Sequence, residues 1–408
     1  MGGEERARVG LPRAYTLWLV GILVSLAGNA VFYFALGWSA SKYGGSIAGL
    51  TLSAITLPRV LLLLLGGAVG DRVSTRRVLI TGDAAMLVFS LILAAVAYSL
   101  GTPPLLLVAA GIAVGVVDAF YLPASGSMPR RLVPKAQLPR ALSLRQIGGQ
   151  MINMGGAPLA GALVGLAGFA GAAVVNAVTF AFALVVLTVV RPQHDIPPAP
   201  RSEGLLKEAL NGVKVAFSHP VLRPGLWLTA AAAGLLLPVM SLLVPLLARE
   251  EQWSAGSAGL VLGAQGVGMV VITLMVVKRG PLGRPGLLAA SGLVLAGAGV
   301  LALGLVPGPT AATIAGLLVG VGNGTFSAHI APLVLASSPD THLSRIQAVL
   351  VLVQSSALLL MNNALGALVD LEGATAVVVA CAVLLIGVGL AGLASGPLRN
   401  DRTGLAQG

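Results

Sequence analysis

Residues 67–77, GAVGDRVSTRR, separate two long apolar segments and combine one carboxylate, Asp71, with three arginines, Arg72, Arg76 and Arg77. A connection this short between two membrane-length segments must turn the chain at a membrane surface. Charged side chains crowded there can bind one another and the ends of neighbouring helices. The stretch therefore predicts a protein whose helices cross a membrane and whose charged residues gather on one side of it.

The composition of the whole chain agrees with this interpretation. Of the 408 residues, 56% are hydrophobic and only 10% are charged. A soluble domain could not bury that much apolar surface, so the chain belongs in a lipid bilayer. The net charge of +11 does not indicate nucleic-acid binding, because the positions of the basic residues follow membrane topology.

Twelve segments of roughly 20 apolar residues, enough to cross ~30 Å of hydrocarbon, can be drawn along the sequence. They lie near residues 15–38, 46–66, 77–99, 104–122, 142–166, 169–190, 223–247, 257–277, 286–306, 310–336, 346–369 and 373–396. With the N-terminus inside, and with residues at the edges of spans counted with the adjoining loop, all but three of the 25 Lys and Arg fall in cytoplasmic loops and tails, as the positive-inside rule requires. The exceptions are Lys42 and Arg249 outside and Arg59 within a span. We expect an all-α integral protein of the cell membrane with both termini cytoplasmic.

The quoted loop resembles the signature of the major facilitator superfamily, Gly-x-x-x-Asp-Arg/Lys-x-Gly-Arg-Arg/Lys. The matching residues are Gly67, Asp71, Arg72 and Arg76, whereas positions 74 and 75 depart from the pattern. The resemblance implies a monomer of twelve transmembrane helices in two pseudo-symmetric six-helix bundles. It also implies that the loop is a latch that holds one conformation of a transporter, and that Asp118, at the inner end of helix 4, is a partner of this latch.

A proline-rich stretch divides the chain in two. Residues 191–201, RPQHDIPPAPR, predict a polar linker. Residues 204–218 follow with apolar side chains on one helical face and Lys207, Glu208 and Lys214 on the other, which is typical of a helix lying on the inner leaflet. We therefore expect one six-helix bundle at 1–190, a cytoplasmic linker with an amphipathic helix at 191–222, and a second bundle at 223–408.

Phrases in both halves resemble the branch of the superfamily that includes macrolide-efflux proteins and the enterobactin exporter. They lie at residues 118–165, 204–226 and 254–271. Within the first, NMGGAPLAG at 153–161 resembles the antiporter motif of helix 5 through Gly156, Pro158 and Gly161. The branch implies a secondary active exporter of amphipathic small organic molecules, drug-like or siderophore-like, that works by alternating access and is coupled to protons.

Charged residues inside the predicted spans are candidates for proton coupling. Arg59 lies near mid-membrane, where an unpaired arginine costs ~2.5–3.5 kcal/mol on insertion scales. It could form an ion pair that joins helices 2 and 4, or contact substrate, and the two roles are compatible. Asp83 and Asp118 could carry protons, because desolvation raises the pKa of a carboxyl group and a neighbouring cation lowers it. Asp83 could instead face the loop arginines near the surface. His329 could relay protons or be a structural imidazole.

Polar uncharged side chains in the spans could line a cleft or join helices. Asn29 and Tyr33 lie one turn apart on helix 1, and helix 5 has one polar stripe. The candidates for a substrate cleft are Asn29, Tyr33, Arg59, Gln146, Gln150, Asn153, Gln265, Asn323 and Gln354. Such a cleft has little negative charge, so it fits a neutral or anionic molecule better than a multivalent cation.

Several classes of activity have no support in the sequence. There is no P-loop for ATP hydrolysis, no zinc spacing among the four histidines, and one cysteine, Cys381, which excludes a disulfide framework. No nucleophile–base pair suggests an enzyme, so we expect neither catalysis nor a cofactor nor a metal. Two alternatives to an exporter stay open: a nutrient or metabolite importer on the same fold, and a membrane receptor or scaffold with transporter ancestry.

Overall fold

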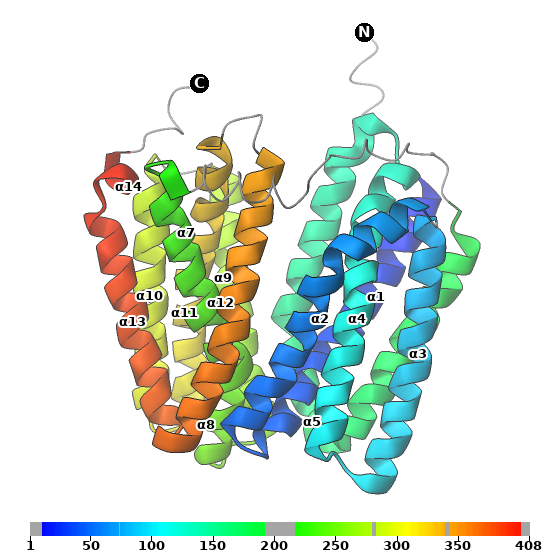
Figure 1. The fold of residues 1–408 in the computed structure, drawn as a ribbon, viewed down its shortest axis with the longest axis horizontal. Coiled ribbons are helices and arrows are strands. Elements are labelled where there is room, and N and C mark those ends of the chain that lie inside the picture. Colours follow the sequence, from blue (N-terminus) through cyan, green and yellow to red (C-terminus); the bar gives the residue numbers. More distant parts are fainter. Residues whose placement is uncertain (1–9, 73, 192–216, 280–282, 339–342, 401–408) are drawn as a thin grey trace. The chain divides into compact units, whose positions relative to one another are not determined.

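The structure is a computed structural model that describes residues 10–72, 74–191, 217–279, 283–338 and 343–400. Side chains at 63–72, 153, 335, 343–345, 348 and 400 also lie outside the description. The described residues form helices joined by short turns, with no strand among them (Figure 1). A helix satisfies its backbone N–H and C=O groups internally, which is what the hydrocarbon interior of a bilayer demands of a spanning segment.

Eleven helices in the described part of the chain are long and apolar enough to cross a membrane. One of them, α5 (Leu138–Val189), breaks at Gly168, where φ is 61° and ψ is −162°. This backbone conformation favours glycine, and each part of α5 is long enough to span. The described residues therefore provide twelve spans, which confirms the number predicted from the apolar segments.

The first unit comprises residues 1–39 and 54–200. Its elements are α1 (Arg13–Ser41), α2 (Gly45–Arg72), α3 (Thr75–Leu100), α4 (Pro104–Leu132), the short 3₁₀ turn η2 (Lys135–Gln137) and α5. Helix α3 packs against both α4 and α5. Where α1 begins, Tyr15, Trp18, Leu79 and Met128 form an apolar core. The Tyr15 hydroxyl in this core donates a hydrogen bond of 2.5 Å to the carbonyl oxygen of Ala141.

The second unit comprises residues 40–53 and 201–408. Its first span contains α7 (Leu222–Ala231), the π-helical turns η3 (Ala232–Leu236) and η4 (Val239–Leu243), and α8 (Val244–Glu250). Pro238 lies between the two π turns. Proline has no N–H and its ring displaces the carbonyl of the preceding turn, so the helix around it departs from regular α-helical hydrogen bonding. The other helices are α9 (Ala255–Arg279), α10 (Pro285–Leu305), α11 (Pro309–Ala336), α12 (Leu343–Glu372), α13 (Ala374–Ala394) and α14 (Gly396–Asn400).

The first residues of α2 belong to this second unit. Asp370 on α12 accepts hydrogen bonds from the backbone N–H groups of Gly45, at 2.6 Å, and Ser46, at 2.9 Å. It thereby satisfies two of the free donors at the start of α2. The predicted boundaries at 190 and 223 stay a prediction, because residues 192–216, with most of the expected amphipathic helix, lie outside the described part of the chain.

Two helices extend beyond the apolar segments that predicted them. Helix α4 continues past residue 122 to Leu132, and α5 begins at Leu138 rather than near 142. Pro139 occupies the first turn of α5. Proline is tolerated there because the N–H groups of a helix's first turn have no acceptor within the helix. Consequently Arg145, which the charge count placed in a loop, lies about two turns into a helix. That placement was wrong, because an arginine near the start of the 142–166 segment was counted with the preceding loop although the helix begins earlier still.

Candidate functional site

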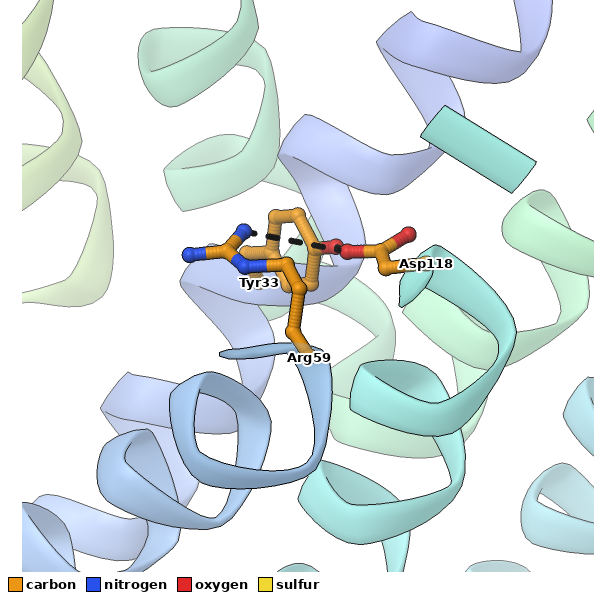
Figure 2. Close-up of polar contacts among 3 residues, drawn as sticks. All are labelled: Tyr33, Arg59 and Asp118. Carbon is orange, nitrogen blue, oxygen red and sulfur yellow. Dashed lines mark hydrogen bonds and ion pairs between the residues drawn. The ribbon is translucent and has the colours of Figure 1, made fainter. Parts of the chain in front are cut away.

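Three polar side chains from three helices meet in the first unit. The Tyr33 hydroxyl on α1 donates a hydrogen bond of 2.7 Å to Oδ2 of Asp118 on α4, and Nη1 of Arg59 on α2 lies 3.9 Å from the same oxygen. Figure 2 shows both groups approaching this oxygen, while the other carboxyl oxygen points away from them. The side chains of Arg59 and Asp118 are 32% and 13% exposed. The attraction between them is therefore intermediate between its strength in water and in a dry interior.

The ion pair depends on a close approach of α2 and α4 one turn away. A Cβ on Gly115 would overlap the carbonyl oxygen of Ile55, so glycine allows the two backbones to touch. Gly115 precedes Asp118 by three residues and Ile55 precedes Arg59 by four, so each helix presents both of its residues on one face. The pair between helices 2 and 4, one of the two roles predicted for Arg59, is thus present.

Asp118 also forms part of the wall of a cavity of about 470 Å³ between α1, α4 and α5. The polar residues of the wall are Ser25, Asn29, Asp118, Tyr121, Ser125, Arg145 and Gln146, and the others are Ile22, Leu23, Leu26, Leu122, Leu142 and Gly149. An apolar lining with a few convergent polar groups is typical of small-molecule sites. The structure therefore brings three of the predicted residues, Asn29, Asp118 and Gln146, to one cavity.

Sequence reasoning missed four polar residues of this wall, Ser25, Tyr121, Ser125 and Arg145, and Arg145 is the charged one among them. Its guanidinium bonds to the carbonyl and hydroxyl oxygens of Ser125 on α4 and lies over the ring of Trp18 on α1. The proline near the start of α5 is the signal that could have found it. Proline at the first turn marks a helix start, which would have placed Arg145 about two turns inside the helix instead of in the preceding loop.

Asp83 on α3 lies apart from the cavity wall. Its side chain is fully buried, and whether it faces the loop arginines near the membrane surface stays a prediction, because the side chains of residues 63–72 are not described. It faces the Tyr121 hydroxyl, yet neither carboxyl oxygen has a described partner in good hydrogen-bonding geometry. Since Tyr121 is also a wall residue, this phenol stands between Asp83 and the cavity.

The remaining candidates on α5 have other surroundings. Gln150 is not among the cavity residues and has a bonding partner, and the side chain of Asn153 lies outside the description. Gly156 faces α1, because a Cβ there would lie 2.9 Å from that of Ala30. Pro158 lies within the helix, and Gly161 is buried.

Four predicted residues lie in the second unit. His329 on α11 is 2% exposed, and its Nδ1 lies 2.8 Å from the Thr325 carbonyl oxygen, while its Nε2 has no partner among the described residues. Asn323 on the same helix donates to Sδ of Met269 at 3.4 Å. Gln265 on α9 is partly buried and Gln354 on α12 is exposed. Their roles in a cleft or a proton relay stay predictions.

The signature stretch is described only in part. The side chains of residues 67–72, which include Gly67, Asp71 and Arg72, lie outside the description. Arg76 donates to the carbonyl oxygens of Leu187, Thr188 and Val190 at 2.8–3.0 Å, which confirms that this stretch binds the end of a neighbouring helix. Its charge there complements the negative end of the helix dipole.

Asp118 does not sit at the inner end of helix 4. It lies midway along α4, which continues to Leu132, so the expected position was wrong. The error follows from taking the end of the apolar segment as the end of the helix. Whether Asp118 is a partner of the latch stays a prediction, because the side chains of Asp71 and Arg72 are not described.

For metals, the described residues contain no group of three or more His, Cys, Asp or Glu side chains that could hold an ion.

Known proteins resemble this chain in sequence. The model of the Major Facilitator Superfamily matches residues 17–362. The multidrug efflux pump Tap of Mycolicibacterium fortuitum is 27% identical over 249 residues. That match covers 56% of this chain and 58% of Tap, so it spans less than two thirds of either protein.

Solved structures resemble it in fold. A bacterial homolog of the human lysosomal transporter Spinster, in an inward-facing and unoccupied conformation, has a TM-score of 0.76 and 14% identity over 96% of this chain and 98% of its own. A mutant of the peptide transporter POT in complex with sulfate has a TM-score of 0.73 and 17% identity over 93% of this chain and 94% of its own. A mutant of the nucleoside transporter NupG has a TM-score of 0.72 and 13% identity over 94% of this chain and 100% of its own. By its family match and its twelve-helix fold, this chain belongs to the major facilitator superfamily.

Proposed function

We propose that this protein is a secondary active exporter that moves amphipathic small organic molecules across the cell membrane by alternating access, in exchange for protons. The observation that carries the proposal is the cavity of the first unit, whose wall contains the ion-paired carboxyl group of Asp118. Leucine and isoleucine side chains share that wall with amides, hydroxyls and charged groups. Such a lining suits a molecule with an apolar body and a few polar groups. Similarity to the efflux pump Tap supports export over uptake.

In this proposal Asp118 carries the proton. The ionised carboxylate attracts Arg59 and accepts the hydrogen bond of Tyr33. Protonation removes the charge and with it most of the attraction to Arg59. The close contact of α2 and α4 then loses an electrostatic restraint, and the population shifts toward another arrangement of the helices.

Asp83 is the second proton carrier of the proposal. It is buried behind Tyr121 rather than in the cavity wall, so in this proposal protons pass from the cavity to it by way of that phenol. The signature-loop residues Gly67, Asp71, Arg72 and Arg76 form the latch that protonation releases. His329, with one ring nitrogen bonded to its own helix, is a further relay candidate.

The test is transport in proteoliposomes with an imposed pH gradient. Antibiotics, dyes and siderophores are first screened for thermal stabilisation of the purified protein, and stabilising compounds are then assayed for accumulation. Asp118→Asn and Asp83→Asn should each abolish accumulation driven by the gradient. Glu251→Gln, which alters an exposed carboxylate at the end of α8, is the matched control and should retain it.

Three outcomes would contradict the proposal. Accumulation that persists in both aspartate variants would show that protons enter elsewhere or are not used. Movement of substrate only toward the cytoplasmic side would identify an importer. Stabilisation by no compound of the panel would favour a receptor or scaffold.

A further inference from the structure

The guanidinium of Arg145 has a fixed position on the cavity wall. Its Nη1 donates to the Ser125 carbonyl oxygen at 3.3 Å and its Nη2 to the Ser125 hydroxyl at 3.0 Å. Its Cζ lies 5.6 Å from the centre of the Trp18 ring. These contacts, from α4 and α1, hold a long side chain in one orientation. None of them neutralises its charge, because a carbonyl, a hydroxyl and an aromatic ring carry no formal negative charge.

The charge of Arg145 has no counter-ion among the described residues. Within that part of the chain, Asp118 is the one acidic residue of the cavity wall, and it already binds Arg59 and Tyr33. An unpaired guanidinium on a membrane-spanning helix is costly, and by default marks a functional site. Guanidinium has five N–H donors in a planar fork, so donors remain after both bonds to Ser125.

From these contacts we infer that Arg145 binds the acidic group of the transported molecule, which makes amphipathic organic acids the substrate class of this cavity. The inference rests on the proposed function, in which the cavity holds the substrate. A carboxylate, sulfonate or phosphate group can accept two parallel N–H bonds from one guanidinium. The amide of Gln146 lies in the same wall, and Leu23, Leu122 and Leu142 provide apolar surface for the body of the molecule.

Arg145 also joins two helices through its bonds to Ser125, so a loss of stability alone would say nothing about a ligand. Selectivity between an acid and its uncharged derivative does discriminate. A residue that only joins α4 and α5 affects the binding of both molecules alike, whereas an anion-binding residue affects the acid alone.

The experiment is equilibrium binding of fluorescent pairs to the full-length purified protein in detergent. Dansyl-leucine, which carries a carboxylate, is compared in one pair with its methyl ester and in the other with dansyl-leucinamide, neither of which is charged at neutral pH. The wild type should prefer the acid of each pair about tenfold or more, as a charge-assisted hydrogen bond provides. Arg145→Gln should lose this preference and leave the affinity for the ester and the amide within about twofold of wild type. Arg140→Gln, exposed on the same helix and outside the cavity wall, should keep the preference.

Equal weakening of acid and ester in Arg145→Gln, or a wild type that prefers the acid of neither pair, overturns the inference. If Arg145→Gln does not fold, Arg145→Lys replaces it, because lysine keeps the charge but lacks the planar fork. A reduced acid preference in Arg145→Lys supports the inference, and an unchanged one overturns it.

Binding requires neither transport nor a gradient, so the two proposals can fail separately. An acid preference that Arg145→Gln removes, in a protein that exports nothing, leaves the anion site standing without the exporter. If the protein exports substrate but Arg145→Gln keeps the acid preference, the exporter stands without the anion site.

Discussion

Removing both partners of the pair between Arg59 and Asp118 should destabilise the first unit by less than the sum of the two single removals. The two atoms are 3.9 Å apart, which corresponds to about 4 kcal/mol of attraction at an effective dielectric constant near 20. Because the Arg59 side chain is 32% exposed, solvent screens part of this attraction, and fully exposed pairs contribute only about 0.2–1 kcal/mol. We therefore expect a coupling free energy of about 2 kcal/mol, between these two limits.

A double-mutant cycle measures this quantity. Arg59→Gln, Asp118→Asn and the double variant are purified, and the free energy of unfolding of each is obtained by equilibrium titration in mixed detergent micelles. Asparagine keeps a carbonyl oxygen that can accept the Tyr33 hydrogen bond, so Asp118→Asn removes mainly the charge. Arg77→Gln, at an exposed arginine of the same unit, is the control and should change stability by less than about 0.5 kcal/mol.

Additivity of the two single changes within about 0.5 kcal/mol would refute the reasoning. The distance between the two groups would then correspond to no net attraction, and protonation of Asp118 would release nothing that holds α2 to α4. The proton-coupled step of the proposed mechanism would lose its basis, even if the fold and the cavity remained as described.

Two further predictions concern helix contacts. Gly115→Ala should destabilise the protein by about 1–3 kcal/mol, because its Cβ would overlap the backbone of α2; Gly165→Ala, with nothing within 4 Å of its Cβ, should be neutral or slightly stabilising in the same thermal-unfolding assay. Asp370→Ala should cost about 0.5–2 kcal/mol, since it leaves two N–H groups at the start of α2 without their acceptor. Asp370→Asn, which retains an acceptor, should lose less, and an equal loss in both variants would contradict the capping role.

The number and order of the spans could be predicted from the sequence because a bilayer leaves the backbone little choice. Each segment must satisfy its hydrogen bonds internally and cover itself with apolar side chains over a fixed thickness. Hydropathy therefore maps directly onto helices, even across the break at Gly168. The same physics predicted a partner for Arg59, because an unpaired guanidinium at mid-membrane is costly.

The composition of the candidate site could be predicted only in part. Asn29, Asp118 and Gln146 were candidates because they are polar residues in apolar segments, and they share one cavity wall. Hydropathy alone says nothing about which way a helix is rotated, so it could not place Asp83 behind Tyr121. Arg145 was counted with the preceding loop because it lies near the start of the apolar segment 142–166, whereas α5 already begins at Leu138.

The sequence by itself determined that this protein crosses a membrane twelve times and belongs to a transporter superfamily, because apolar length and a short charged motif are local properties of the chain. Only the tertiary structure decided which polar groups meet. Tyr33, Arg59 and Asp118 come from three helices and converge on one oxygen, and Arg145 enters the cavity with no described counter-ion. The first arrangement depends on the close contact of α2 and α4 at Gly115 and the second on the bonds of Arg145 to Ser125, and both require packing between distant segments.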